Sequence, residues 1–214
     1  MQPGAGINEK QHDMRILVVG GNGTIGSKVS AHFKDKNEVI IAGRSSGDIT
    51  VDIADSNSIQ SMFEESGKFD AIICIAGNSK WAAFDELSEE DYYIGLKSKL
   101  MGQVNLVRIG QHYLNPNGSI TLTTGILAED PVVKTTSAAL VNGGIHSFVK
   151  AVSLEIENGI RVNVIAPGLV EDSYEKLKDY FPGHIPVPMK KVLAAYERSV
   201  LGRDHGQVIR IYEK

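Results

Sequence analysis

Short apolar runs alternate along the chain with longer segments in which apolar residues recur at helical spacing. Runs such as ILVV, AIICIA and VNVIA lack the polar alternation of a half-exposed strand, which predicts strands buried on both faces. The predicted strands are residues 16–19, 38–42, 71–75, 119–123, 161–165 and 208–212. The predicted helices lie between them, at residues 24–33, 56–65, 89–112, 140–157 and 188–201.

Strands that alternate with helices predict a parallel sheet covered by helices on both faces, with right-handed crossovers. The expected fold class is α/β, a doubly wound parallel sheet of the Rossmann type in three layers (α/β/α). It is expected to form a single domain over residues 14–214. Residues 1–13 are polar and lack the apolar stretch of a secretory signal, so we expect a disordered N-terminal tail.

The composition narrows the class of protein. Hydrophobic residues make up 42% and charged residues 22% of the 214 residues, as in ordinary soluble domains. A net charge of -4 gives no general attraction to nucleic acid or anionic membrane, and neither is an expected partner. No apolar run approaches the roughly 20 residues of a membrane-spanning helix. The single cysteine, Cys74, excludes an intrachain disulfide, and a cytoplasmic protein is expected.

The segment GGNGTIG lies between the first predicted strand and the first predicted helix. In that position Gly20 permits a tight turn, Gly23 lets the backbone approach a pyrophosphate, and Gly26 lets the helix pack closely on the sheet. The N–H groups at the helix N-terminus then meet the phosphate charge. A glycine-rich turn without a ligand is the alternative, because the spacing is G-x-x-G-x-x-G. The residues expected to bind a dinucleotide here are Gly20, Asn22, Gly23, Thr24, Ile25 and Gly26.

The second strand indicates which dinucleotide binds. NAD sites usually carry an acidic residue about 20 residues after the glycines, on the ribose 2′-hydroxyl. Here the strand is followed by Arg44 and Ser45, and a guanidinium can form a bidentate contact with a 2′-phosphate. NADP is therefore the expected cofactor and NAD is less favoured, although Asp48 lies nearby and Arg44 as a solvated loop residue is the alternative.

Together with the glycine segment, several other segments resemble the short-chain dehydrogenase/reductase family from about Met14 to the C-terminus. VDIAD resembles the family's adenine-contacting segment, CIAGN its turn after the fourth strand, GIRVNVIAPG its Pro-Gly loop, and GQVIRIY its last strand. The resemblance implies cofactor contacts from Asp52, Ile53, Ala76, Gly77, Pro167 and Gly168. It also implies a homodimer or homotetramer.

The family's catalytic residues are where the resemblance fails. It implies a serine, a tyrosine, a lysine and a supporting asparagine, but Ala138 stands at the tyrosine position and Asn142 at the lysine position. Neither can supply the usual proton or charge. The serine position falls on Thr124 or Gly125, and Lys99 stands where the asparagine is expected.

The candidate catalytic residues are therefore Thr124, through its hydroxyl, and Lys99, whose ammonium would reach the same region from another helix. The alternative is that both family positions have drifted and that Lys99 is an ordinary helix lysine. Tyr174 follows the Pro-Gly loop and is a further candidate for a lid residue. No metal is expected, because His112 and His146 have no Cys, His or Asp at ligand spacing.

These observations leave two main functional hypotheses. The first is an NADP-dependent oxidoreductase that reduces or oxidises a small carbonyl or alcohol with a non-standard catalytic set. The second is a non-catalytic NADP(H)-binding redox sensor or partner-binding module. A scaffold that no longer binds nucleotide is a third hypothesis, against which the intact glycine segment argues. The sequence names no substrate.

Overall fold

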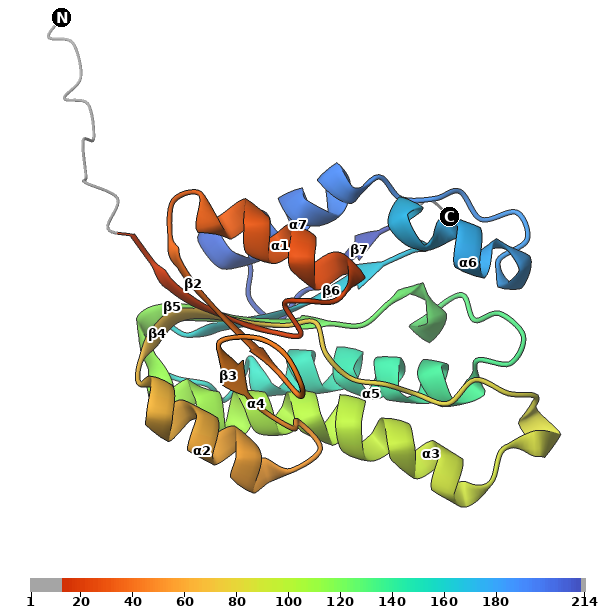
Figure 1. The fold of residues 1–214 in the computed structure, drawn as a ribbon, viewed down its shortest axis with the longest axis horizontal. Helices are drawn as coiled ribbons and strands as arrows, with labels where there is room; N and C mark the ends of the chain where they lie inside the picture. The colour runs from red at the N-terminus through yellow and green to blue at the C-terminus, as the bar shows by residue number, and fades with distance from the viewer. Residues whose placement is uncertain (1–12, 213–214) are drawn as a thin grey trace, which may run out of the picture.

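The computed structural model describes residues 13–212. Within them, seven parallel strands form one sheet in the order β3-β2-β1-β4-β5-β6-β7 (Figure 1). The predicted tail at residues 1–13 lies outside the described residues, apart from Asp13. The strands are β1 (Arg15–Val19), β2 (Glu38–Gly43), β3 (Ile49–Thr50), β4 (Phe69–Cys74), β5 (Leu114–Thr123), β6 (Arg161–Pro167) and β7 (Val208–Ile211). The expected doubly wound α/β fold is confirmed.

Helices cover both faces of the sheet, as Figure 1 shows, with α1, α6 and α7 on one face and α2, α3, α4 and α5 on the other. Each layer is held by its own cluster of buried apolar side chains, one beneath α1 and α7 and one beneath α2, α4 and α5. The helices are α1 (Thr24–Lys34), α2 (Ser56–Ser66), α3 (Glu89–Gly95), α4 (Gly102–Gly110), α5 (Thr136–Val152), α6 (Tyr174–Leu177) and α7 (Met189–Leu201). Burial on both faces explains why the strands carry continuous apolar runs.

The single helix predicted over residues 89–112 is a continuous helical segment of changing geometry. It begins as α3, becomes the π-helix η2 (Leu96–Met101), continues as α4 and ends in the 3-10 turn η3 (Gln111–Tyr113). The start is fixed by Ser88, which accepts a hydrogen bond from the Asp91 N–H in a capping box. The π segment changes the direction in which its side chains point and lies beside the candidate site.

Two predicted elements were wrong in extent. The helix predicted over residues 140–157 is α5, which begins at Thr136 and ends at Val152, because a turn through Asn158 and Gly159 at positive φ precedes β6. The strand predicted over 119–123 is β5, which begins at Leu114 with a register irregularity opposite β4. The short strand β3 was not predicted, and the remaining bounds differ by one or two residues.

Short helical turns complete the edge of the sheet where the strands end. They are η1 (Phe84–Glu86), η4 (Ile126–Ala128), η5 (Glu171–Ser173) and η6 (Lys178–Tyr180). With α6, these turns build a small apolar cluster of Ile126, Leu127, Ala138, Leu169 and Phe181 above the carboxyl ends of β5 and β6. No helix among residues 13–212 is long and apolar enough to cross a membrane.

Candidate active site

Two adjoining cavities lie at the carboxyl ends of the parallel strands, where ligands of open α/β sheets bind. The first, of about 400 Å³, lies over β1, β2 and β4. The second, of about 360 Å³, lies over β5 and β6 and is walled by α5 and η2. Gly77 and Asn78 line both cavities, so the two form one continuous cleft across the end of β4.

The glycine segment forms the floor of the first cavity. Gly20 has a φ of +84° and lines the cavity together with Asn22 and Gly23. A Cβ atom on Gly26 would overlap the carbonyl oxygen of Gly20, so the close packing of α1 on the turn requires glycine. Thr24 and Gly26 line neither cavity, whereas Ile25 lines the second.

Helix α1 begins at this floor without a side-chain cap, because its N-cap residue is Gly23. The first N–H groups of any helix lack intrahelical partners, and their positive end of the helix dipole favours an anion. Since Gly23 lines the first cavity and Ile25 the second, the uncapped N-terminus lies where the two cavities meet. This geometry fits a pyrophosphate.

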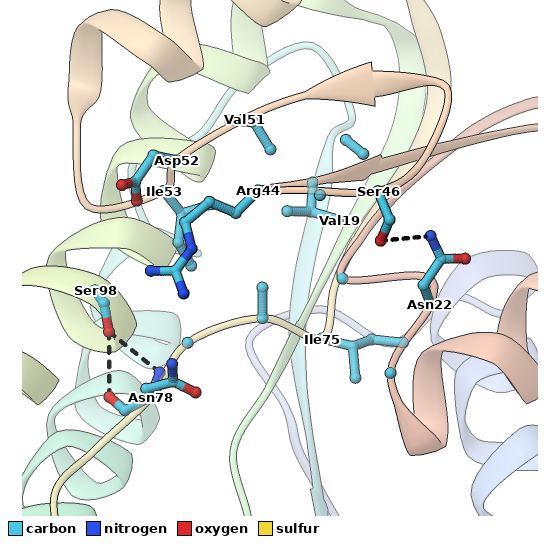
Figure 2. A pocket seen from close by; sticks show the side chains of 16 residues that line it. Val19, Asn22, Arg44, Ser46, Val51, Asp52, Ile53, Ile75, Asn78 and Ser98 are labelled. Carbon is cyan, nitrogen blue, oxygen red and sulfur yellow. Dashed lines mark hydrogen bonds between the residues drawn. The ribbon is translucent and has the colours of Figure 1, made fainter.

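Arg44 extends across the first cavity in Figure 2, and within residues 13–212 its guanidinium has no hydrogen-bond or ion-pair partner. Ser46 lies on the opposite wall and accepts a hydrogen bond from the Asn22 side chain at 3.0 Å. Ser45, the neighbour that the sequence favoured, does not line the cavity. Asp48 is turned away, because its carboxylate accepts a hydrogen bond from the Ile41 N–H at 2.9 Å.

The far end of the first cavity is formed by the segment after β3. Asp52 and Ile53 both line it, as the family resemblance implies for an adenine-binding wall. The Asp52 carboxylate also accepts a hydrogen bond from the Ala54 N–H at 3.0 Å, which holds the turn that leads into α2. Ala76 lines the same cavity beside Gly77.

Lys99 is fixed in the second cavity by a close backbone contact. Gly77 has a φ of +119°, and a Cβ atom there would lie 2.8 Å from the Cα, Cβ and Cγ atoms of Lys99. The neighbouring Ser98 hydroxyl accepts from the Asn78 N–H at 3.1 Å and can donate to the Asn78 carbonyl at 3.2 Å, so η2 is fastened to this turn. Figure 2 shows these two hydrogen bonds between Ser98 and Asn78 at the wall of the first cavity.

Lys99 is positively charged at neutral pH, but its pKa lies much closer to neutrality than that of an ordinary lysine. Burial lowers the pKa of its ammonium from 10.5 to about 8, and the interaction with Cys74 acts in the opposite direction. Among the described residues, the ammonium has no hydrogen bond or ion pair. A desolvated, unpaired ammonium that lines a cavity is suited to holding negative charge on a ligand.

The two positions for which the resemblance implies a tyrosine and a lysine also face the second cavity. Ala138 and Asn142 are buried, lie one turn apart on α5 and line the cavity. The Asn142 Oδ1 atom is a buried acceptor without a hydrogen-bond partner. A buried orphan acceptor is costly unless a ligand group or a water completes it. Pro167 and Gly168 form the wall opposite α5.

Thr124 and Gly125, the two candidates for the serine position, both line this cavity. The Thr124 Oγ1 atom lies 2.8 Å from Nε2 of His146, and Nδ1 of His146 lies 3.9 Å from Oε1 of Glu129. The sequence prediction had no role for His146 or Glu129. The available signal was spacing, because Ala138, Asn142 and His146 recur every four residues along one face of a helix.

Apolar side chains supply most of the remaining wall of the second cavity, including Trp81, Leu127, Leu177 and Phe181. Tyr174 does not line the cavity and packs against the apolar cluster above it. Among residues 13–212, no group of three or more His, Cys, Asp or Glu side chains is close enough to hold a metal ion.

Residues 24–187 match a family model described as enoyl-(acyl carrier protein) reductase. The chain belongs to the short-chain dehydrogenase/reductase family. Among curated relatives, it is 25% identical over 133 residues to 2,3-dihydro-2,3-dihydroxybenzoate dehydrogenase of Escherichia coli, covering 59% of this chain and 54% of that protein. It is 29% identical over 132 residues to oxidoreductase UcpA of Salmonella typhimurium, covering 57% and 49%. The chain thus spans about half the length of the curated relatives it matches.

Solved structures also match this protein over nearly the whole chain. The protein lin1944 from Listeria innocua is 45% identical with a TM-score of 0.91, and the match covers 93% of this chain and 100% of that chain. A small-chain dehydrogenase solved in complex with NADPH is 27% identical with a TM-score of 0.82, covering 94% and 97%. The expected family is confirmed.

Nicotinamide dinucleotides are the cofactors of the short-chain dehydrogenase/reductase family, and the cleft fits one. A Cβ atom on Gly20 would press on the Ala76 backbone and one on Gly26 would overlap the Gly20 carbonyl, so the turn and the start of α1 pack as closely as a dinucleotide-binding turn requires. Asn142 lines the second cavity, and its Oδ1 atom is buried without a hydrogen-bond partner. The residues expected from the sequence therefore meet in one cleft, apart from Thr24, Gly26 and Ser45, which lie beside it.

Proposed function

We propose that this protein is an NADP(H)-dependent oxidoreductase that interconverts a small carbonyl compound and its alcohol without the family's tyrosine and lysine. The observation that carries the proposal is the continuity of the two cavities through Gly77 and Asn78. Arg44 lies at one end, the glycine floor and the start of α1 lie at the junction, and Lys99 and Thr124 lie at the other end. A dinucleotide anchored by its phosphates at the junction would present its nicotinamide to these two residues.

The preference for NADP(H) rests on charge in the first cavity. Arg44 lines it with an unpaired guanidinium, and the carboxylate of Asp48 is held by the β2 backbone outside it. A guanidinium forms strong charge-assisted hydrogen bonds with a phosphate. The 27% identical small-chain dehydrogenase in complex with NADPH supports the same choice.

The chemistry divides between the cofactor and the chain. When bound, the nicotinamide ring supplies or accepts the hydride. The Lys99 ammonium compensates the negative charge that develops on the substrate oxygen, and the Thr124 hydroxyl donates a hydrogen bond to that oxygen. Asn142, where the resemblance implies the family's lysine, lines the cavity with an uncharged side chain. Lys99 thus supplies charge from η2 where the family supplies it from α5.

The substrate is small and mainly apolar. Lys99 is the one charged side chain among the described residues that line the second cavity. In this proposal its ammonium interacts with the substrate oxygen. The other lining side chains are uncharged, and Trp81, Leu177 and Phe181 are the largest apolar ones among them. A substrate carboxylate or phosphate would find no second cation in that cavity.

Fluorescence titration of the purified protein with NADPH and with NADH tests the cofactor assignment, since Trp81 lies in the cavity wall. We expect tight binding that favours NADPH, followed by NADPH oxidation with small aldehydes and ketones. Binding without any turnover would contradict the enzymatic proposal and favour a non-catalytic NADP(H)-binding protein. No binding of either dinucleotide would contradict both.

A further inference from the structure

We propose that His146 passes a proton from solvent beside Glu129 to the Thr124 hydroxyl, and so takes over the proton supply that the family assigns to its tyrosine. The inference rests on the proposed function, because it concerns the same second cavity. It assigns Thr124 as the catalytic residue that touches the substrate oxygen. His146 is a positioning residue that acts through Thr124.

The contacts form a line from the cavity to the surface. Thr124 lines the cavity and is 7% exposed, and its Oγ1 atom lies 2.8 Å from Nε2 of His146, which is also 7% exposed. On the other side of the ring, Nδ1 lies 3.9 Å from Oε1 of the partly exposed Glu129. This spacing is too long for a direct hydrogen bond, so the final transfer at Nδ1 takes place with solvent beside the carboxylate.

Two hydrogen-bond donors, one in β7 and one directly after it, hold the Glu129 side chain in place. The Arg210 Nε atom donates to Oε1 at 2.7 Å, and the Tyr212 hydroxyl donates to Oε2 at 2.7 Å. The carboxylate therefore stays beside His146 on the η4 turn. A loop residue fixed by two hydrogen bonds from another element is a specific arrangement for an otherwise exposed side chain.

The imidazole is neutral over the working pH range. Burial lowers the pKa of His146 from 6.5 to about 4, while Arg210 and Lys150 lower it further and Glu129 raises it. Tyr212, the other titratable group at this end, is engaged with Glu129. A neutral imidazole has one N–H group and one lone pair, so it can give a proton at Nε2 and take one at Nδ1 without holding a net charge.

In the direction of carbonyl reduction, a proton passes from solvent through His146 and Thr124 to the substrate oxygen. Hydride addition to the carbonyl carbon leaves a negative charge on the substrate oxygen, which takes the Thr124 hydroxyl proton. Thr124 recovers a proton from Nε2 of His146, and Nδ1 takes one from solvent beside Glu129. One proton has moved from solvent to the product alcohol, and exchange with solvent returns the ring to its Nε2–H form. Alcohol oxidation reverses each transfer.

A purely structural histidine that fills the space behind β5 is the competing explanation, and substitutions separate the two. In the His146→Gln variant the side-chain amide can still donate to Thr124 but cannot transfer a proton. Thr124→Val removes the hydroxyl at similar volume, and Thr124→Ser restores it. His112→Gln is the matched control, because His112 is exposed on η3 at the opposite edge of the sheet.

The experiment follows NADPH oxidation with benzaldehyde and with 2,3-butanedione as carbonyl probes, in H2O and D2O. We expect His146→Gln and Thr124→Val each to lower kcat about 100-fold, within the range for general acid catalysis. KM and NADPH affinity should stay within about twofold, because neither group is assigned to ground-state binding. The double variant should lose no more than either single one.

The solvent isotope effect on kcat gives the readout that a structural role would not move. This isotope effect should be smaller in His146→Gln than in the wild-type protein when the two are compared at equal cofactor saturation. Thr124→Ser should recover the kcat lost in Thr124→Val. If the His146→Gln variant has the same kcat as the wild-type protein, the relay is overturned and the proposed function still stands. Equal losses of kcat and NADPH affinity would identify a structural histidine and also overturn it. No turnover by the wild-type protein with either probe would overturn the proposed function and the relay together.

Discussion

The two halves of the cleft are built on different principles. In the first cavity the shape is made by backbone, through the turn at Gly20 and the uncapped start of α1 at Gly23. In the second cavity it is made by side chains from separate elements, with Lys99 on η2, Thr124 after β5 and Asn142 on α5. The first half carries the expected glycine segment, whereas the second half is lined by Ala138 and Asn142 where the resemblance implies a tyrosine and a lysine.

The contrast teaches which features of a dinucleotide fold can be rearranged. A backbone cradle requires glycine at fixed spacing, because a Cβ on Gly26 would overlap the Gly20 carbonyl oxygen. Charge and hydroxyl groups are required only at a point in space, so any element that reaches the point can supply them. We therefore expect substitutions in the second cavity to change rate, and substitutions in the first to change binding.

The largest effect is expected for Lys99→Met. Removing the ammonium should lower kcat about 10³-fold, in the range for losing a group that stabilises transition-state charge, with NADPH affinity nearly unchanged. Because the pKa of Lys99 is lowered to about 8, its charge is present below that pH, and wild-type kcat for reduction should fall above it. Steady-state kinetics from about pH 6 to about pH 10, a range that brackets this pKa, measure both effects. Lys97→Met is the control, because Lys97 is exposed on the same helix; an equal loss there would contradict the assignment.

Gly26→Val should act on binding instead. The added side chain meets the Gly20 carbonyl and must displace the glycine floor, so NADPH affinity should fall about 100-fold, or about 2.7 kcal/mol. Gly143→Ala is the matched control on α5, where a Cβ meets nothing within 4 Å. It should leave NADPH affinity unchanged and stabilise the protein by up to about 1 kcal/mol. Fluorescence titration and urea unfolding measure the two, and unchanged NADPH affinity in Gly26→Val would contradict the role of the first cavity.

Arg44→Gln should reduce the preference for NADPH over NADH without weakening NADH binding. Loss of the hydrogen bonds to a 2′-phosphate should reduce the NADPH preference about tenfold, since hydrogen bonds to charged groups contribute about 1.5–3 kcal/mol. Parallel titrations with NADPH and NADH give the ratio, and Arg108→Gln, an exposed arginine on α4, is the control. An unchanged ratio would place the discrimination elsewhere in the cleft.

The smallest effect concerns stability. His146 has a folded-state pKa of about 4 and an ordinary value of 6.5, so the unfolded chain binds the proton first as the pH falls. The free energy of unfolding should therefore decrease between about pH 6.5 and pH 4, by about 1 kcal/mol from pH 7 to pH 5 after allowance for solvent screening. His146→Gln should flatten this part of the urea-unfolding profile, whereas His112→Gln should not. An unchanged profile in His146→Gln would contradict a neutral buried imidazole.

The sequence predicted the sheet, the family and the glycine floor because each depends on local or periodic patterns. The π-helix η2 was not predicted, because it packs against a turn distant in sequence, where Gly77 contacts Lys99 and the Asn78 N–H donates to the Ser98 hydroxyl. The helix predicted at residues 140–157 begins at Thr136 because its first turn is anchored by contacts such as Tyr92 to Thr136, at 3.0 Å between hydroxyl oxygens. The link from Thr124 through His146 to Glu129 joins β5, α5 and η4, and no single segment carries it.

The central claim is that the second cavity performs hydride transfer with a rearranged catalytic set. The most direct measurement incubates the protein with benzaldehyde and with NADPH in which both hydrogens at C4 of the nicotinamide are deuterium, and determines deuterium in the alcohol by mass spectrometry. The account predicts deuterated alcohol with wild-type protein and far less with Lys99→Met, at equal NADPH occupancy. Bound NADPH with no deuterium in the alcohol above the protein-free control would contradict it.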